Sequence, residues 1–306
     1  MKKKILVTGA EGFLGHHLIN HLKKQKIFGM VKKLPKKKIK DVTYFKCDIQ
    51  NKKKIKNIIR KIKPDIIFHL AAKSHPLFSF KYPSKTISVN VLGTINLLQN
   101  LVELKYNPKI IIACSSAQYG TRLYKELPLN EKSSLKPDHI YGLSKLFQKF
   151  LGDQFYQMFK LKIINATIFN TSGPGKKNDV FNDFSKQYLN QINKDKTVKI
   201  LCGNISNKRD FLHYDDTVRA LDIISRKGKV GENYNISTGK LIKIKSLIDY
   251  IKEKSSKKIE AKQRNYFFRA YDEKYISGDS KKLKKIGWKP KKNYKNILDE
   301  MCKFKN

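Results

Sequence analysis

The chain has 306 residues, of which 40% are hydrophobic, so it is long enough for one large core or for two unequal domains. Its 66 Lys and Arg against 25 Asp and Glu give a formal net charge of +41. The four cysteines (Cys47, Cys114, Cys202 and Cys302) are far apart and form no Cys-x-x-Cys or Cys/His cluster. We therefore predict no disulfide framework and no metal site, and a reducing, cytoplasmic compartment.

The charge and hydropathy also disfavour two classes of partner. Clustered lysines would indicate nucleic acid, but here they are scattered, as at 36–38, 52–54 and 281–285, without interleaved aromatic residues or a known binding motif. No apolar stretch approaches the roughly 20 residues that span a bilayer, and the N-terminal apolar run is too short for a signal peptide. We expect neither nucleic-acid nor membrane association.

From the N-terminus, short apolar runs alternate with helical patterns. Apolar strands are predicted at 5–8, 27–31, 42–45, 66–69, 110–113 and 163–168, and helices after the first glycines and at 52–62, 89–105 and 141–159. This alternation predicts an α/β fold, a Rossmann-type doubly wound parallel sheet of at least six strands, over residues 1–170. Elements become shorter after Gly173, so residues 171–306 are expected to form mainly a smaller C-terminal α/β substrate-binding domain, with some segments returning to the first domain.

The first strand leads directly into a glycine-rich turn. Gly9, Gly12 and Gly15 have the spacing G-x-x-G-x-x-G, and Phe13 and Leu14 begin the helix that follows. Glycines at this point let the backbone approach a pyrophosphate, whose charge is held by the helix N-terminus. The pattern predicts a dinucleotide-binding turn.

The end of the second strand bears on the choice of dinucleotide. An acidic residue there binds the adenosine ribose hydroxyls, whereas a basic one accommodates a 2′-phosphate. Lys32 and Lys33 occupy this place. We therefore predict NADP as the cofactor, with NAD as the alternative.

The helix at 141–159 opens with the residues that point to chemistry. Tyr141 and Lys145 are four residues apart, so both lie on one face of the helix. A phenol has an ordinary pKa near 10 and needs a nearby ammonium to exchange its proton at neutral pH. Ser116, at the end of an apolar strand, could hydrogen-bond the reacting oxygen, and Ser115 is a less favoured candidate. We predict Ser116, Tyr141 and Lys145 as the catalytic residues.

Together these motifs resemble the extended short-chain dehydrogenase/reductases, also called the NAD-dependent epimerase/dehydratase family, and the resemblance covers nearly the whole chain. It implies that Asp48 and Ile49 contact adenine, that Asn90 belongs to the network near the cofactor, and that Lys145 also holds the nicotinamide ribose. The segment Leu70, Ala71 and Ala72 would line the pyrophosphate and ribose. Homodimerisation through the helices at 89–105 and 141–159 is a further expectation from the family.

The C-terminal half resembles the members that act on GDP-mannose derivatives, namely the GDP-4-keto-6-deoxy-mannose reductases and the GDP-mannose 4,6-dehydratases. The resemblance lies in the segments 169–175, 203–211, 234–240, 269–272 and 278–288. It implies a GDP-linked sugar substrate, with Asn170, Arg209 and Arg269 holding the diphosphate and nucleoside. A guanidinium suits this role because its planar fork matches phosphate oxygens.

Four activities remain to be separated. A 4,6-dehydratase needs a carboxyl group near the sugar. In the dehydratases that the chain resembles, this group follows the catalytic Ser or Thr within two residues, and Ala117 and Gln118 stand there instead. Ala117 also replaces the catalytic cysteine of fucose synthases. A 4-epimerase that retains NAD needs only the serine, tyrosine and lysine and stays open as the alternative. We predict a reductase that uses NADPH on the C4 ketone of a GDP-4-keto-6-deoxy sugar.

Overall fold

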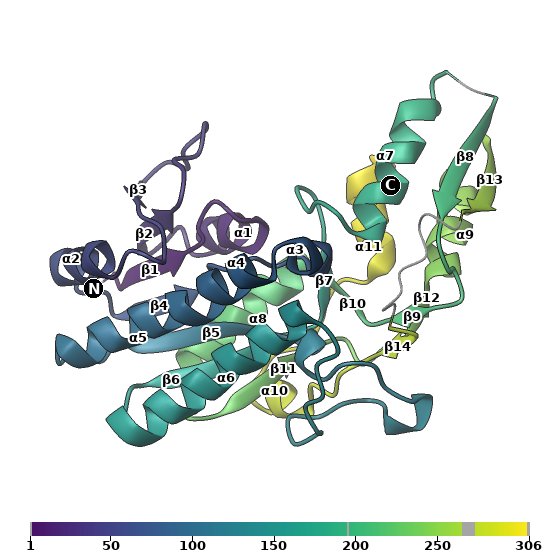
Figure 1. The fold of residues 1–306 in the computed structure, drawn as a ribbon. Helices are drawn as coiled ribbons and strands as arrows, with labels where there is room; N and C mark the ends of the chain where they lie inside the picture. Colours follow the sequence, from purple (N-terminus) through teal and green to yellow (C-terminus); the bar gives the residue numbers. More distant parts are fainter. Residues whose placement is uncertain (1, 195, 265–272, 305–306) are drawn as a thin grey trace.

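The computed structural model describes residues 2–194, 196–264 and 273–304, and a seven-stranded parallel sheet forms its centre (Figure 1). The strand order is β11-β6-β5-β4-β1-β2-β3. The predicted Rossmann-type sheet is therefore confirmed, with a seventh strand supplied from far along the chain. The strands are β1 (Lys4–Thr8), β2 (Lys26–Val31), β3 (Val42–Lys46), β4 (Ile66–His69), β5 (Lys109–Ser115), β6 (Ile163–Ile168) and β11 (Asn233–Ile236).

Strand order reverses between β1 and β4. The chain runs outward from β1 through β2 to β3 and then returns to place β4 on the other side of β1, with Thr8 beside His69. In open parallel sheets, ligands bind at the carboxyl ends of the strands at such a switch point. The glycine turn after β1 and the segment after β4 both lie there.

Helices cover both faces of this sheet. Leu6 and Val7 on β1 show why: their side chains alternate, and each enters a different hydrophobic core. The core around Val7 is covered by α1 (Phe13–His21) and α8 (Tyr214–Lys227), and the core around Leu6 by α2 and α5. The remaining helices of the first 170 residues are α2 (Lys52–Ile62), α3 (Pro76–Lys81), α4 (Pro83–Ile87), α5 (Gly93–Glu103) and α6 (Ile140–Phe159).

The predicted long helix at 89–105 has an irregular start. Residues Ser88–Leu92 form a single π-helical turn between α4 and α5, and Asn90 lies in its middle. Such turns often occur at functional sites, because the extra residue redirects side chains. Here the helical pattern was predicted correctly, but its local geometry was not.

The later part of the chain forms a smaller body beside the sheet (Figure 1). Three small sheets pair as β10-β7, β12-β9-β14 and β13-β8, around a third core that includes Phe181, Ile200 and Leu247. The strands are β7 (Asn170–Ser172), β8 (Thr197–Cys202), β9 (Lys208–Arg209), β10 (Phe211–His213), β12 (Ile242–Lys243), β13 (Lys258–Gln263) and β14 (Tyr275–Ile276). The helices are α7 (Val180–Gln191), α9 (Ile244–Lys254) and α11 (Tyr294–Cys302).

The chain passes repeatedly between the two parts. After β10 it returns as α8 and β11, and later as α10 (Lys281–Lys285) and the buried Trp288, whose Nε1 donates to the carbonyl of Asp216 at 2.9 Å. None of the described helices is long and apolar enough to cross a membrane.

Candidate active site

The glycine turn leaves bare backbone at the start of α1. Gly9 has φ +68°, and a Cβ there would lie 2.8 Å from the Cα of Ala71. A Cβ on Gly15 would lie 2.3 Å from the carbonyl oxygen of Gly9. In the described chain no side chain caps α1, whose N-cap is Gly12 and whose first residues are Phe13 and Leu14. These N–H groups suit a phosphate, so the turn fits a dinucleotide.

The segment after β4 lies against this turn. The backbone N–H of Ala71 donates to Oγ1 of Thr8 at 3.1 Å, and that of Leu70 to the carbonyl of Thr8 at 3.3 Å. Leu70, Ala71 and Ala72 are partly buried. The structure thus brings together two predicted cofactor segments that are about sixty residues apart in the chain.

A third predicted cofactor segment lies at the ends of β2 and β3. Nζ of Lys32 is 2.8 Å from a carboxylate oxygen of Asp48, and the backbone N–H of Lys32 donates to Glu11 at 2.8 Å. Burial alone would raise the pKa of Asp48, but hydrogen bonds from Lys32 and Gln50 lower it overall. Ile49 is buried in the core beside α5. Sequence reasoning gave Glu11 no role of its own, and the structure puts this second carboxylate beside Lys32.

Tyr141 and Lys145 lie on the first turns of α6, beside the end of β5. Tyr141 is 9% exposed, and burial raises its pKa to about 12, although a hydrogen bond with the Ser115 side chain opposes the rise. Lys145 is 4% exposed and donates from Nζ to the carbonyl of Ala113 at 2.8 Å. Burial lowers the pKa of Lys145 to about 8. The phenol is therefore protonated at neutral pH, with an ammonium one helical turn away.

The hydroxyl that influences the phenol is that of Ser115, the neighbour of the predicted Ser116. We predicted Ser116 as the catalytic hydroxyl, but the Tyr141 side chain bonds with Ser115, the last residue of β5. Ser116 is one residue further, in the 3-10 turn Ser116–Gln118. Ser115 still has extended backbone, whereas Ser116 begins the turn, so the direction of each hydroxyl depends on where the strand ends. This contact favours Ser115 as the hydroxyl beside the phenol, and the role of Ser116 stays a prediction.

A buried polar network lies near Lys145. His69 Nδ1 is 2.9 Å from Thr8 Oγ1, and its Nε2 is 2.9 Å from Thr94 Oγ1, which also accepts from Gln148 at 2.7 Å. Burial, together with the Lys145 charge, lowers the pKa of His69 to about 3. The imidazole is therefore neutral at physiological pH and serves to join β1, β4, α5 and α6. Sequence reasoning assigned His69, Thr94 and Gln148 no role.

Asn90 joins this network to the segment after β4. Its Oδ1 accepts the backbone N–H of Lys73 at 2.7 Å, and its Nδ2 lies 3.1 Å from the Lys73 carbonyl and 2.9 Å from Oγ of Ser144. The predicted place of Asn90 near the cofactor segments agrees with these contacts. The side chain fixes the 70–73 backbone relative to α6.

The predicted substrate residues lie on the side of the smaller body. Asn170 begins β7, two residues after Ile168, the cross-strand neighbour of Ser115. Its Nδ2 is buried and has no hydrogen-bond partner among the described residues, so it could donate to a ligand. Arg209 is buried, two residues before Phe211, the strand partner of Asn170. Arg269 lies outside the described residues.

Arg209 is held within a small sheet. Its Nε lies 3.9 Å from Glu273, and its Nη1 donates to the carbonyl of Lys208 at 3.1 Å. The next residue, Asp210, is fully buried and accepts the backbone N–H groups of Thr238 and Gly239 at 2.9 and 2.8 Å. Asp210 was not singled out from the sequence, and it fixes the strand that carries Arg209.

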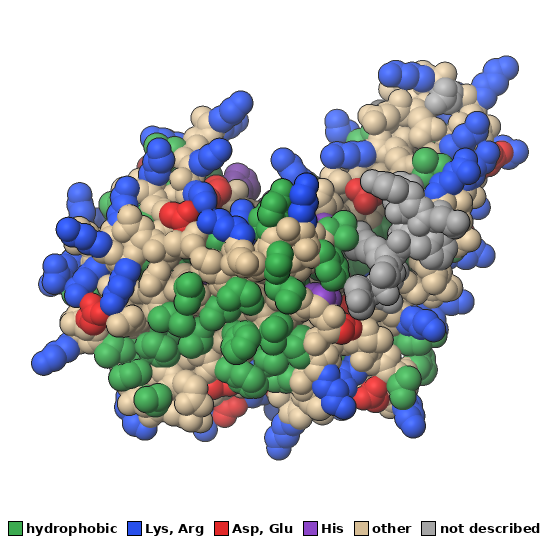
Figure 2. Space-filling model, in the orientation of Figure 1, with side chains coloured by type: hydrophobic (Ala, Val, Ile, Leu, Met, Phe, Trp, Pro, Cys, Tyr) green, Lys and Arg blue, Asp and Glu red, His purple; other side chains and the backbone are tan. Residues whose placement is uncertain are grey.

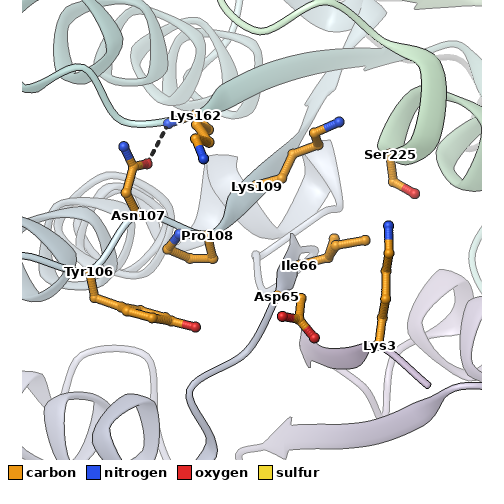
Figure 3. Close-up of a pocket in the computed structure, with 9 residues that line it drawn as sticks. All are labelled: Lys3, Asp65, Ile66, Tyr106, Asn107, Pro108, Lys109, Lys162 and Ser225. Atoms are coloured by element: carbon orange, nitrogen blue, oxygen red, sulfur yellow. Dashed lines mark hydrogen bonds between the residues drawn. The ribbon is translucent and has the colours of Figure 1, made fainter. Parts of the chain in front are cut away.

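Two further features do not include any of the predicted site residues. His213, Asp215 and Glu300 gather closely enough to hold a cation, but the Lys292 ammonium lies 2.8 Å from both carboxylates and already neutralises them. A depression of about 300 Å³ lies at the opposite edge of the sheet, where β4, β5 and β6 begin (Figure 3). Its lining residues are Lys3, Asp65, Ile66, Tyr106, Asn107, Pro108, Lys109, Lys162 and Ser225.

Comparison with known proteins places this site among nucleotide-sugar enzymes. Residues 6–301 match the family model described as GDP-mannose 4,6 dehydratase. The chain is 26% identical to the GDP-6-deoxy-D-mannose reductase of Pseudomonas aeruginosa over 300 residues, 97% of this chain and 95% of that one. It is 34% identical to the dTDP-D-glucose 4,6-dehydratase of Dictyostelium discoideum over 77% of this chain, but the match spans only 58% of that protein.

A solved structure agrees with the same comparison. The structure of RMD from Pseudomonas aeruginosa in complex with NADPH superposes with a TM-score of 0.86 at 25% identity, covering 99% of this chain and 97% of that one. The similarity therefore extends over both parts of the fold.

Proposed function

The chain belongs to the GDP-mannose 4,6 dehydratase family, and from this premise we propose that it is a reductase rather than a dehydratase. Its substrate would be a GDP-4-keto-6-deoxy sugar, reduced at C4 with NADPH. The observation that carries the proposal is the cluster of the partly buried Ser115 with the buried Tyr141 and Lys145, which has no carboxyl group in the three residues that follow Ser115.

The three side chains can carry out proton transfer to a ketone. Because burial keeps Tyr141 protonated at neutral pH, its hydroxyl can donate to the oxygen that gains charge during reduction. Lys145 lies one turn along α6 and stabilises the phenolate that remains. Ser115, next to Tyr141, hydrogen-bonds the substrate oxygen and holds it in position for this proton transfer. Bound NADPH supplies the hydride.

Dehydration requires an acid or base that this site lacks. Removal of the C5 proton and of the C6 hydroxyl needs a carboxyl group close to the sugar. Ser116, Ala117 and Gln118 follow Ser115. Gln118 is buried and donates from Nε2 to Thr167 at 3.1 Å, and an amide cannot exchange the proton. These residues support reduction.

One observation favours a second candidate, a 4-epimerase that retains NAD. Lys32, the residue expected at a 2′-phosphate, is paired with Asp48 and lies beside Glu11. Carboxylates at this place suit the free ribose hydroxyls of NAD. NADP is our proposed cofactor because a 2′-phosphate could displace Asp48 from Lys32.

The decisive experiment follows nicotinamide absorbance at 340 nm with GDP-4-keto-6-deoxy-mannose and either NADPH or NADH. We expect oxidation of NADPH, loss of about two to four orders of magnitude in kcat for Tyr141→Phe, and a larger loss for Ser115→Ala than for its neighbour Ser116→Ala. No oxidation by the wild-type chain, together with tightly retained NAD and C4 inversion, would support the epimerase instead.

We also propose a homodimer that is formed through α5 and α6. Figure 2 shows hydrophobic side chains gathered over these helices, whereas Lys and Arg are spread over the rest of the visible surface. The exposed members include Leu92, Phe147, Phe150, Met158 and Phe159. A continuous exposed apolar face of this kind usually marks an interface. We also propose that the protein is cytoplasmic, and the free cysteines of the chain are compatible with this location.

Light scattering after size exclusion tests the dimer. Phe150 is 46% exposed on α6, and Phe150→Glu should convert a dimer to a monomer. Leu123 is 62% exposed on the loop after β5, and Leu123→Glu should leave the dimer intact. A wild-type monomer would contradict the proposal.

A further inference from the structure

The loop that joins β7 to α7, residues 173–179, is bonded both to α1 and to the segment that precedes α3, and we call it the strap. Near its start, the carbonyl of Pro174 lies 2.9 Å from Nε2 of His17 on α1. Near its end, the carbonyl of Asn178 lies 3.0 Å from Nε2 of His75, which immediately precedes α3. The strap is therefore attached at one end to α1 and at the other to the segment after β4.

His17 lies on the helix that follows the glycine turn, and His75 lies in the segment after β4. The turn and the segment after β4 touch directly, because a Cβ on Gly9 would meet the Cα of Ala71 at 2.8 Å. The uncapped start of α1 adjoins the same contact. A loop attached on both sides must pass close to the place where a pyrophosphate would meet the backbone N–H groups.

Lys176 lies between the two attachment points. Its Nζ is 5.2 Å from the centre of the Phe13 ring, and Phe13 is the first residue of α1. Lys176 is partly buried, and burial lowers its pKa, whereas the nearby Asp179 opposes this effect. Asp179 itself caps α7 by accepting from the Asn182 N–H at 2.9 Å. The structure thus holds an ammonium group in a partly dehydrated position beside the helix N-terminus.

We propose that Lys176 is a ligand of the cofactor pyrophosphate and that the strap holds the dinucleotide in its groove. The inference rests on the proposed function, since it requires a dinucleotide at the glycine turn. The N–H groups of α1 would face the pyrophosphate from the large sheet, and the Lys176 ammonium would face it from the strap. Because the strap leads into α7, binding of the cofactor would also fix the smaller body against the larger one.

Binding measurements on Lys176→Met test this, with Lys176→Arg to retain the charge and Lys177→Met as the matched control on the exposed neighbour. Cofactor-stripped protein is titrated with NADPH, with ADP-ribose, which has the pyrophosphate but no nicotinamide, and with adenosine 2′-phosphate, which lacks the pyrophosphate. We expect Lys176→Met to weaken NADPH and ADP-ribose roughly tenfold to a hundredfold. Adenosine 2′-phosphate should be unaffected, and Lys176→Arg and Lys177→Met should bind all three like the wild type.

The outcomes separate this inference from the proposed function. Wild-type affinity for NADPH in Lys176→Met would overturn the role of Lys176 alone. Equal losses for ADP-ribose and adenosine 2′-phosphate would overturn it too, because they would indicate a general charge effect. A wild-type chain that binds no dinucleotide would refute the proposed function itself.

Discussion

Replacement of Lys145 by Met should remove a pH dependence from the stability of the folded chain. Lys145 is buried, and its pKa is lowered from 10.5 to about 8. Between these values the unfolded chain binds more protons than the folded one. The free energy of unfolding therefore rises as the pH increases through this window. The buried ammonium destabilises the folded chain most below pH 8.

The size of the effect follows from the two pKa values. The burial of charged Lys145 costs about 3 kcal/mol at pH 7 and about 1 kcal/mol at pH 9.5, so the wild-type chain gains roughly 2 kcal/mol over this range. Lys145→Met has no such gain. Loss of the hydrogen bond to Ala113 lowers the stability of the variant equally at both pH values, so it cancels from the comparison.

Urea unfolding without cofactor measures the difference. The free energy of unfolding is compared at pH 7 and pH 9.5 for wild type, Lys145→Met and Tyr141→Phe, a control that keeps the lysine. Wild type and Tyr141→Phe should each gain about 2 kcal/mol relative to Lys145→Met, while Lys145→Met loses at least about a hundredfold in kcat. If the free energies of unfolding of wild type and Lys145→Met differ by the same amount at both pH values, Lys145 is not a strongly dehydrated ammonium.

Other substitutions test the remaining parts of the site. Gly9→Ala should lower stability by about 1–2 kcal/mol from its left-handed backbone and further from the contact with Ala71. Gly239 also has a left-handed φ, +81°, but a Cβ there would lie 3.6 Å from the nearest atom. Gly239→Ala should therefore show only the backbone cost in urea unfolding. Asp210→Asn should cost about 2–4 kcal/mol by the same assay, because it disturbs several buried hydrogen bonds, and a near-neutral result would contradict that role. Lys32→Ala should reduce the ratio of kcat/KM for NADPH over NADH about tenfold. An unchanged ratio would mean that Lys32 pairs with Asp48 and does not bind the 2′-phosphate.

Much of the site could be predicted because its signals are local. Tyr141 and Lys145 share a face by helical geometry alone, and the spacing of Gly9, Gly12 and Gly15 identifies a strand-to-helix turn. The choice between Ser115 and Ser116 could not be made in this way. It depends on where β5 ends and on which hydroxyl then faces α6, and a shift of one residue reverses that direction.

The sequence by itself determined the alternation of strands and helices, the parallel sheet, and the residues capable of proton transfer. Periodicity and backbone preference act over a few neighbouring residues and can be read directly from them. Only the tertiary structure decided that β11 completes the sheet, that Asn90 fixes the backbone at Lys73, and that the strap spans from α1 to the segment after β4. These arrangements depend on contacts between residues distant in the chain, and the packing of the whole core selects among the many pairings that local patterns allow.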